Sequence, residues 1–166
     1  MRIAGIVRDS IVDGIGIRDT IFFQGCPHRC KGCHNPQTWD YDGGEEISIT
    51  EILDVLSNSS NDITISGGEP LEQFDELLNL LEAIRKTTNK RVWLYTGYVF
   101  DFKLSSNIYA LNLLSNYVDV LIDGKFIESL KGNYQFKGSD NQRLIDLPRS
   151  VKENKIILWE EHYGEV

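Results

Sequence analysis

The three cysteines of this chain are its most informative residues, because all of them fall within eight positions. Cys26, Cys30 and Cys33 form a CX3CX2C pattern, and thiolates clustered in this way indicate a metal site or redox chemistry rather than a chance grouping. Zinc would need a fourth protein ligand, which His28 or His34 could supply. A cubane iron–sulfur cluster held by three cysteines would instead leave one iron open for chemistry. The cysteine spacing alone leaves both metals open.

Composition and charge restrict the size of the protein, its class of partner and its cellular compartment. The chain has 166 residues with 17 Lys/Arg and 25 Asp/Glu, which gives a net charge of −8. This length fits a single domain over residues 1–166, and the acidic balance argues against a nucleic-acid partner. The first residues lack an apolar signal-peptide segment, and no apolar run is long enough to span a membrane. Since three cysteines cannot all pair, we expect a cytoplasmic protein.

Short apolar segments alternate with amphipathic ones along most of the chain. Strands are predicted where β-branched and aromatic residues gather, and helices where apolar residues recur at helical spacing after a cap such as Ser48 with Glu51. The predicted strands span residues 17–23, 63–65, 92–95, 118–122, 142–147 and 155–159. One predicted helix begins after Ser48, and two others span residues 70–86 and 107–115. This alternation predicts an α/β fold with a parallel sheet.

The number of strands limits the architecture. About five or six mainly parallel strands are too few for a closed eight-stranded barrel, so we expect an open, partial β/α barrel. Ligands of open α/β sheets bind at the carboxyl ends of the strands. Four segments come directly after predicted strands: the cysteine loop, Gly67-Gly68, Thr96-Gly97 and Asp123-Gly124. The sequence therefore predicts that these segments meet at one site.

Two motifs in this order resemble the radical S-adenosylmethionine (SAM) superfamily: CX3CX2C after one strand, and Ser66-Gly67-Gly68-Glu69-Pro70 after the next. On its own, the second motif is typical of a turn at a helix start. The resemblance implies a [4Fe-4S] cluster on the three cysteines, with SAM on the fourth iron. It also implies that Gly67, Gly68 and Glu69 receive the SAM amino group, since glycine allows close backbone approach and a carboxylate can pair with an ammonium.

The residue before the third cysteine departs from the superfamily pattern, in which an aromatic side chain is common. This chain has Gly32 at that position. The resemblance therefore implies that adenine is contacted partly by the backbone of Gly32, Cys33 and His34.

Several other residues are weaker candidates. The resemblance makes Thr96, Asp123 and Lys125 possible SAM contacts, although each lies in a segment that is also typical of a strand end or turn. The polar residues 137–143 fit either a ligand or partner contact or a solvated loop. The three tryptophans are expected in the core or at a partner surface, and His162 is expected to be solvated.

Two further motifs narrow the resemblance within the superfamily. The segment Val12-Asp13-Gly14-Ile15-Gly16-Ile17-Arg18 resembles the VDGxGxR motif of enzymes that install glycyl radicals, and residues 33–39 read CHNPQTW. Cys-x-Asn-Pro-x-x-Trp is similar to the activating proteins of anaerobic ribonucleoside-triphosphate reductase, and the similarity extends over about residues 12–149. The resemblance implies reductive cleavage of SAM and hydrogen abstraction from a backbone glycine of the reductase large subunit. It implies no general base, and it implies an electron donor such as a flavodoxin-like protein.

Two alternatives stay open at this point. The chain could activate another glycyl-radical enzyme, such as one of the formate-lyase type. It could also be a zinc-binding interaction module without catalysis, because CX3CX2C spacing occurs in short metal loops of several kinds.

Overall fold

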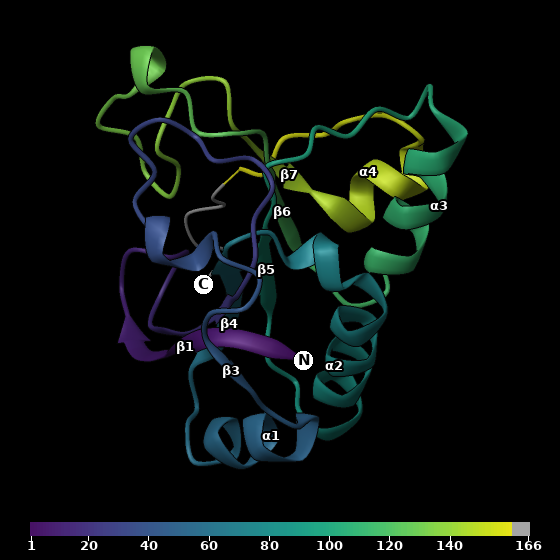
Figure 1. Cartoon of the computed structure of the whole chain (residues 1–166). Helices are drawn as coiled ribbons and strands as arrows, with labels where there is room; N and C mark the ends of the chain where they lie inside the picture. Colours follow the sequence, from purple (N-terminus) through teal and green to yellow (C-terminus); the bar gives the residue numbers. More distant parts are fainter. Residues whose placement is uncertain (161–166) are drawn as a thin grey trace.

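Seven strands form one open sheet in the computed structural model, which describes residues 1–160. The strands are β1 (Arg2–Ser10), β2 (Arg18–Phe23), β3 (Glu45–Glu46), β4 (Asp62–Gly67), β5 (Val92–Tyr95), β6 (Val120–Asp123) and β7 (Arg143–Asp146). Their order across the sheet is β3-β1-β2-β4-β5-β6-β7 (Figure 1). Strands β2, β4, β5 and β6 are parallel, whereas the pairs β1–β2, β1–β3 and β6–β7 are antiparallel.

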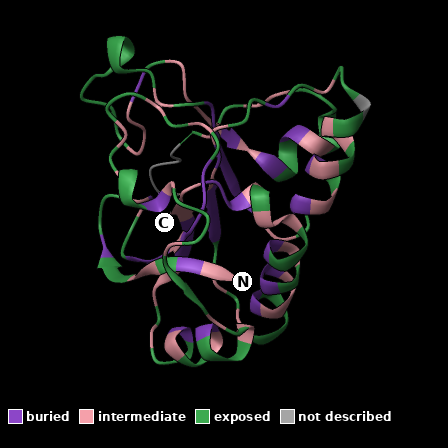
Figure 2. Cartoon of the chain, in the orientation of Figure 1, coloured by how far each residue is buried: buried purple, intermediate pink, exposed green. Residues whose placement is uncertain are grey.

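The helices cover one face of this sheet (Figure 1). They are α1 (Ile49–Ser57), α2 (Phe74–Thr87), α3 (Ser105–Leu114) and α4 (Leu147–Glu153). Right-handed crossovers between successive parallel strands place their helices on the same side. The main core lies between these helices and the sheet, and Figure 2 shows the buried residues concentrated along the strands. It includes Leu56, Leu81, Leu111 and Leu147 from the helices and Ile63, Leu94 and Leu121 from the strands.

Successive side chains of a strand point to opposite faces, and this alternation assigns a second set of residues to the face without helices, here called the inner face. On β4, Ile63 and Ile65 pack in the main core, so Thr64 lies on the inner face. A smaller cluster on the inner face consists of Trp93, Val120 and Ile122, with Ile15, Tyr95, Phe136, Leu144 and Trp159 packed against it. The inner face is thus covered by loops rather than helices.

A buried arginine ties the loop of residues 11–17 to the inner face. Arg18 is fully buried at the start of β2. Its guanidinium donates hydrogen bonds to Thr64 Oγ1 (2.7 Å), to the Ile63 carbonyl (2.6 Å) and to the Ile15 carbonyl (3.1 Å). A Cβ on Gly14 would lie 2.7 Å from Arg18 Cδ, so the loop can pass this side chain only with glycine there.

Most of the predicted elements are confirmed to within a few residues, and the differences lie mainly at the sheet edges. The sheet has seven strands rather than five or six, and only four of them are mutually parallel. Strand β1 was not predicted, since several of its side chains are exposed and Asp9 has a positive φ of 58°. Strand β3 was also not predicted, because it has only two residues.

Three further predictions differ from the structure in detail. No strand forms over residues 155–159 of the described chain, where a single bridge joins Leu158 to Ile145. Within residues 142–147, strand β7 ends early because Leu147 already begins α4 behind the Asp146 cap. The helix predicted from Pro70 starts as a 3-10 turn, and the α-helix begins at Phe74.

No helix among the described residues is long and apolar enough to cross a membrane. The predicted solvated residue His162 lies outside the described residues.

Candidate functional site

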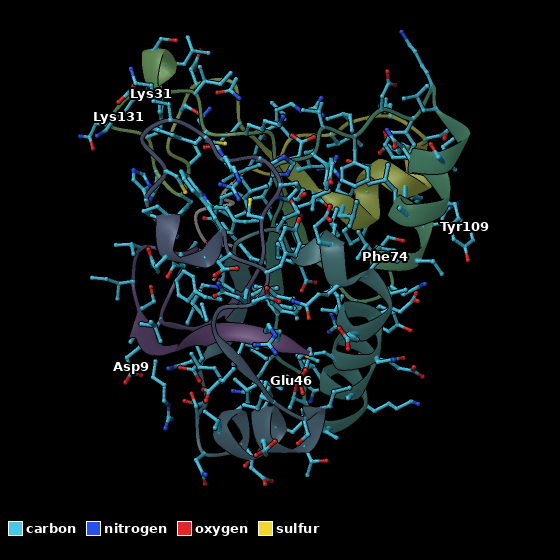
Figure 3. All side chains as sticks on the ribbon, in the orientation of Figure 1. Asp9, Lys31, Glu46, Phe74, Tyr109 and Lys131 are labelled. Carbon is cyan, nitrogen blue, oxygen red and sulfur yellow. The ribbon has the colours of Figure 1, made fainter. Side chains whose placement is uncertain are left out.

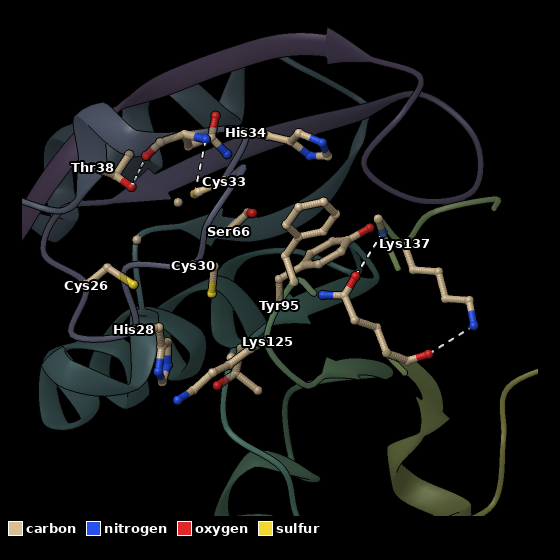
Figure 4. Close-up of a pocket in the computed structure, with 18 of the residues that line it drawn as sticks. Cys26, His28, Cys30, Cys33, His34, Thr38, Ser66, Tyr95, Lys125 and Lys137 are labelled. Atoms are coloured by element: carbon tan, nitrogen blue, oxygen red, sulfur yellow. Dashed lines mark hydrogen bonds between the residues drawn. The ribbon is translucent and has the colours of Figure 1, made fainter. Parts of the chain in front are cut away.

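A pocket of about 360 Å³ lies at the carboxyl ends of the parallel strands (Figure 4). The cysteine loop after β2 and the ends of β4, β5 and β6 all contribute to its wall, as the sequence predicted. Its lining includes Cys26, Cys30, Cys33, His34, Gly67, Gly68, Thr96 and Lys125. The strand ends thus bring eight of the predicted site residues to one cavity. Its size is typical of clefts that bind small molecules.

Backbone hydrogen bonds hold the start and end of the cysteine loop against the Gly67-Gly68 turn. The Gly25 N–H donates to the Thr38 carbonyl (2.8 Å), and the Glu69 N–H donates to the Gly25 carbonyl (2.8 Å). A Cβ on Gly68 would lie 2.4 Å from the Gly25 carbonyl oxygen, a backbone atom that cannot move aside as a flexible side chain could. Glycine at position 68 is therefore required for the two loops to pack together.

The three thiols surround one cavity. Cys26 is 7% exposed, and Cys30 and Cys33 are half-buried. Figure 4 shows the three residues spread around the same part of the pocket, and the Asn35 N–H donates to Cys33 Sγ (3.4 Å). Burial raises the pKa of the Cys26 thiol and of the Cys30 thiol. Deprotonation of these thiols therefore needs a compensating positive charge, which a bound metal supplies.

The donor set fits an iron–sulfur cluster with three protein ligands. Across the described residues, no three His, Cys, Asp or Glu side chains converge closely enough to hold a single metal ion. A cubane cluster binds each cysteine at a different iron, so its ligands lie around a cavity rather than at one point. His28, one of the possible zinc ligands, instead has its Nε2 atom 2.8 Å from Glu69 Oε2.

Glu69 is fully buried and makes four hydrogen bonds inside the protein. Its Oε1 accepts from the Leu71 N–H (3.1 Å) and the Thr96 hydroxyl (2.8 Å). Its Oε2 accepts from the Gly97 N–H (2.7 Å) and from His28 Nε2 (2.8 Å). A carboxylate has about four lone-pair sites, so these contacts use its acceptor capacity. Glu69 is absent from the pocket lining described above, and it links the cysteine loop to the ends of β4 and β5.

Gly32 and Asp123 are also predicted site residues that do not line this pocket. Asp123 is fully buried and accepts two hydrogen bonds from Arg143, with Nε–Oδ1 at 2.9 Å and Nη2–Oδ2 at 2.5 Å. This pairing raises the pKa of Arg143. Gly32 has a positive φ of 76°, and a Cβ there would lie 3.1 Å from Glu128 Oε1. Asp123 thus fixes the end of β6, and Gly32 turns the cysteine loop past the Glu128 side chain.

An aromatic wall on the inner face completes the pocket and was not predicted. Phe22, Tyr95 and Phe136 line it, and the Tyr95 hydroxyl donates to the Phe136 carbonyl (2.7 Å). The alternation of the strands could have placed Phe22 and Tyr95 on this face. Phe136 lies in a loop with a positive φ of 62°, so no periodic pattern reveals it.

The polar segment 137–143 reaches the same wall. Lys137, Gly138 and Gln142 line the pocket, and the Gln142 side chain accepts from the Gly138 N–H (2.8 Å) while donating to the Gly124 carbonyl (2.9 Å). Of the two interpretations that the sequence left open, a loop in contact with the site is the one that matches the fold.

Comparison with known proteins gives a family match and several similar proteins that agree with an iron–sulfur site. Residues 12–145 match the family described as "4Fe-4S single cluster domain". The chain is 36% identical over 140 residues to the anaerobic ribonucleoside-triphosphate reductase-activating protein of Enterobacteria phage T4, covering 80% of this chain and 86% of the relative. It is 35% identical over 143 residues to the protein of that name from Escherichia coli K12, covering 80% and 90%.

A shorter match extends to a second group of activating enzymes. The pyruvate formate-lyase-activating enzyme of Clostridium pasteurianum is 41% identical over 92 residues, which cover 51% of this chain and 39% of that enzyme. The matches to the reductase-activating proteins span far more of both partners. The chain therefore belongs to the 4Fe-4S single-cluster domains and, within them, to the family of anaerobic ribonucleoside-triphosphate reductase-activating proteins.

Proposed function

We propose that this chain cleaves SAM reductively at a [4Fe-4S] cluster and generates a glycyl radical on an anaerobic ribonucleoside-triphosphate reductase. The observation that carries this proposal is the arrangement of the three thiols of CX3CX2C around a pocket whose other wall is the Gly67-Gly68 turn. Relatives that share most of the chain bear the corresponding name.

In this proposal Cys26, Cys30 and Cys33 hold three irons and leave the fourth for the amino and carboxylate groups of SAM. A reduced [4Fe-4S] cluster held there would supply the electron for the reductive cleavage of SAM, and this chemistry would provide the radical that abstracts hydrogen from a glycine of the reductase. The chain's own residues position the reactants and exclude water, and they need no general base.

The residues around the thiols have positioning roles in the same proposal. The backbone at Gly67 and Gly68 approaches the SAM amino group, with Thr96 beside it, because this turn lines the pocket without side chains. Glu69 acts on this region through Thr96 and Gly97, the two partners that it holds from the end of β5.

The adenine is assigned to the opposite side of the pocket. His34 lines the pocket, and its ring packs 5.1 Å from that of Phe126. We assign the adenine to the backbone of Cys33 and His34 and to Lys125, which lies across the cavity (Figure 4), while Gly32 acts indirectly by turning the loop. Asp123 acts indirectly here, by fixing the strand end that precedes Lys125.

The open sheet fits a protein substrate. We propose that residues 1–166 form one radical SAM domain in which the curved sheet is a partial barrel. An edge without further strands leaves room for a glycine-bearing loop of the reductase large subunit. A flavodoxin-like protein is the proposed electron donor, and the cytoplasm is the proposed location because the thiols require a reducing compartment.

Anaerobic electron paramagnetic resonance tests this function directly. The sample contains this chain with reconstituted iron, SAM, dithionite and the candidate reductase. A glycine-centred doublet is expected with the wild-type reductase, and it should vanish when the radical-site glycine of the reductase is changed to alanine. No doublet and no 5′-deoxyadenosine from a protein with full iron content would refute the proposal.

The second candidate is activation of a formate-lyase-type enzyme, which the 41% identity over 92 residues favours. The same experiment decides between the two, because a doublet with that enzyme and none with the reductase would move the assignment. The zinc-module alternative predicts colourless protein after anaerobic purification, whereas a cluster gives brown protein with about four iron and four sulfide.

A further inference from the structure

The charge of this acidic chain is unevenly distributed along the sequence. Residues 24–39 and 124–142 together contain five Lys/Arg and two Asp/Glu, a net charge of +3, whereas the remaining residues carry −11. The first segment is the cysteine loop, and the second follows β6 and forms the other side of the pocket. The two segments nearest the thiols are therefore the cationic part of the chain.

These two segments lie against each other in the fold. Lys31 Nζ is 3.1 Å from Glu128 Oε2, and a Cβ on Gly32 would contact both Glu128 and Phe126. Lys131 contacts the same glutamate, because its N–H donates to the Glu128 carbonyl (3.2 Å). Figure 3 labels Lys31 and Lys131 at one corner of the molecule and the acidic residues Asp9 and Glu46 toward the opposite end. The cations therefore form one patch rather than two separate ones.

The patch combines exposed cations with exposed apolar side chains. Arg29, Lys31 and Lys131 are exposed, and Lys31 and Glu128 are 89% and 48% exposed as side chains. An ion pair this exposed contributes little and leaves Lys31 free to change partners. Ile127 and Leu130, each 41% exposed, flank Glu128 on the short 3-10 turn Glu128–Leu130. We call four of these exposed residues the cluster-side surface: Lys31, Ile127, Leu130 and Lys131.

The cluster-side surface also lies next to the cysteine loop, because Lys31 is adjacent to Cys30 in the sequence and contacts Glu128 of the second segment. Arg29 and Lys31 flank Cys30, and the Phe126 backbone lies within hydrogen-bonding range of the Cys30 thiol. A partner bound here would therefore approach the cluster from outside. The pocket, where the proposed function places SAM and the reductase glycine, would stay accessible from its open side.

We propose that the cluster-side surface is the docking site for an acidic one-electron donor protein; this inference rests on the proposed function. Complementary charge steers such partners together and raises association rates, and the apolar pair Ile127 and Leu130 supplies the desolvated centre that protein interfaces contain. In the reaction, one electron passes from the reduced cofactor of the donor to the oxidised cluster. The donor is thereby oxidised by one electron, and no atom or proton need be transferred.

The test measures association of this chain with a purified, negatively charged flavodoxin. The variant is Lys31→Glu/Lys131→Glu, and the matched control Arg149→Glu/Lys152→Glu makes the same change of net charge at exposed positions of α4. For the wild type, the association rate constant should fall as ionic strength rises to about 0.15 M. For Lys31→Glu/Lys131→Glu at low salt, it should fall about tenfold or more and lose this salt dependence. The control should stay within about twofold of wild type.

Three results would overturn the proposal: unchanged flavodoxin association in Lys31→Glu/Lys131→Glu, an equal loss in the α4 control, or a loss of reductase binding in place of flavodoxin binding. Iron content and the urea midpoint of each variant check that the fold is intact. Glycyl-radical formation with dithionite, which bypasses the donor, separates the two hypotheses. Its absence in wild type refutes the proposed function, whereas its presence with unaltered flavodoxin association refutes the docking site alone.

Discussion

Two fully buried charged side chains lie at opposite ends of the parallel strands, and their partners differ in kind. Arg18, at the amino ends, bonds to Thr64 and to the carbonyls of Ile15 and Ile63, and it stacks 5.2 Å from the centre of the Trp93 ring. Three of these four partners lie within or beside the central strands. The amino ends therefore form a rigid frame.

Glu69, at the carboxyl ends, bonds instead to loop residues: Leu71, Thr96, Gly97 and His28. Each of these residues belongs to a segment that leaves a strand, and one of them lies between two of the cysteines. Arg18 therefore holds the sheet together, whereas Glu69 holds the site loops in register. Changes at the amino ends should affect stability, and changes at the carboxyl ends should affect chemistry.

The largest expected effect is at the carboxyl ends, where Cys26→Ala, Cys30→Ala and Cys33→Ala should each abolish SAM cleavage. Loss of one of three thiolates leaves the cluster labile, so iron content should also fall. The unfolding free energy of the apo Cys30→Ala and Cys33→Ala variants, measured by urea titration, should change by no more than about 0.5 kcal/mol. Ser66→Ala, in the same pocket wall, is the control and should retain iron. Any cysteine variant with full iron and full activity would contradict the ligand assignment.

At the amino ends of the strands, substitution of the buried charge should reduce the stability of the fold. Arg18→Ala leaves buried carbonyl oxygens without donors and empties the space over Trp93, so it should cost about 3–5 kcal/mol of unfolding free energy. Urea unfolding of the apo protein, followed by tryptophan fluorescence, measures this loss. Arg91→Ala removes a neighbouring but exposed side chain and should stay within about 0.5 kcal/mol of wild type. Equal effects of the two substitutions would show that the buried network adds nothing to the frame.

The sequence predicts the frame better than it predicts the site contacts. Period-two patterns in β4 and β5 and the cap at Ser48 depend on nearby residues, so the strands and helices near them could be inferred. The cysteines and the Gly67-Gly68 turn could be assigned to one site because parallel strands end at one edge. The partners of Glu69 could not be inferred, because they come from 2 to 41 positions away and depend on how three loops pack.

Glu69→Gln tests the role of the buried carboxylate at the carboxyl ends of the strands. An amide nitrogen cannot accept a hydrogen bond, so two of the four donors lose their acceptor. Bonds to charged groups contribute roughly 1.5–3 kcal/mol, and the weakened contacts to Thr96, Gly97 and His28 should disturb the site loops, so SAM affinity should fall about 10- to 150-fold while iron content is retained. Calorimetry on the reconstituted protein measures this, with the exposed Glu72→Gln as the matched control. Unchanged SAM affinity would remove Glu69 from any role in the site.

The smallest predicted effect separates a positioning role of Glu69 from direct contact with SAM. His28→Ala removes one of the four hydrogen bonds to Glu69 and touches no thiol, so iron content should be unchanged. A single hydrogen bond contributes roughly 0.5–1.5 kcal/mol, so SAM affinity should fall by about tenfold or less.

The combined variant His28→Ala/Glu69→Gln decides between the two roles. If Glu69 acts by holding the cysteine loop through His28, the double variant should bind SAM about as weakly as Glu69→Gln alone, because the His28 contact is already weakened. If Glu69 contacts SAM directly, the two losses in binding free energy should add. Loss of iron in His28→Ala would instead make His28 a metal ligand and revive the zinc alternative. This double-mutant cycle therefore tests whether Glu69, at the carboxyl ends of the strands, acts by holding other parts of the chain in place, as Arg18 does at the amino ends.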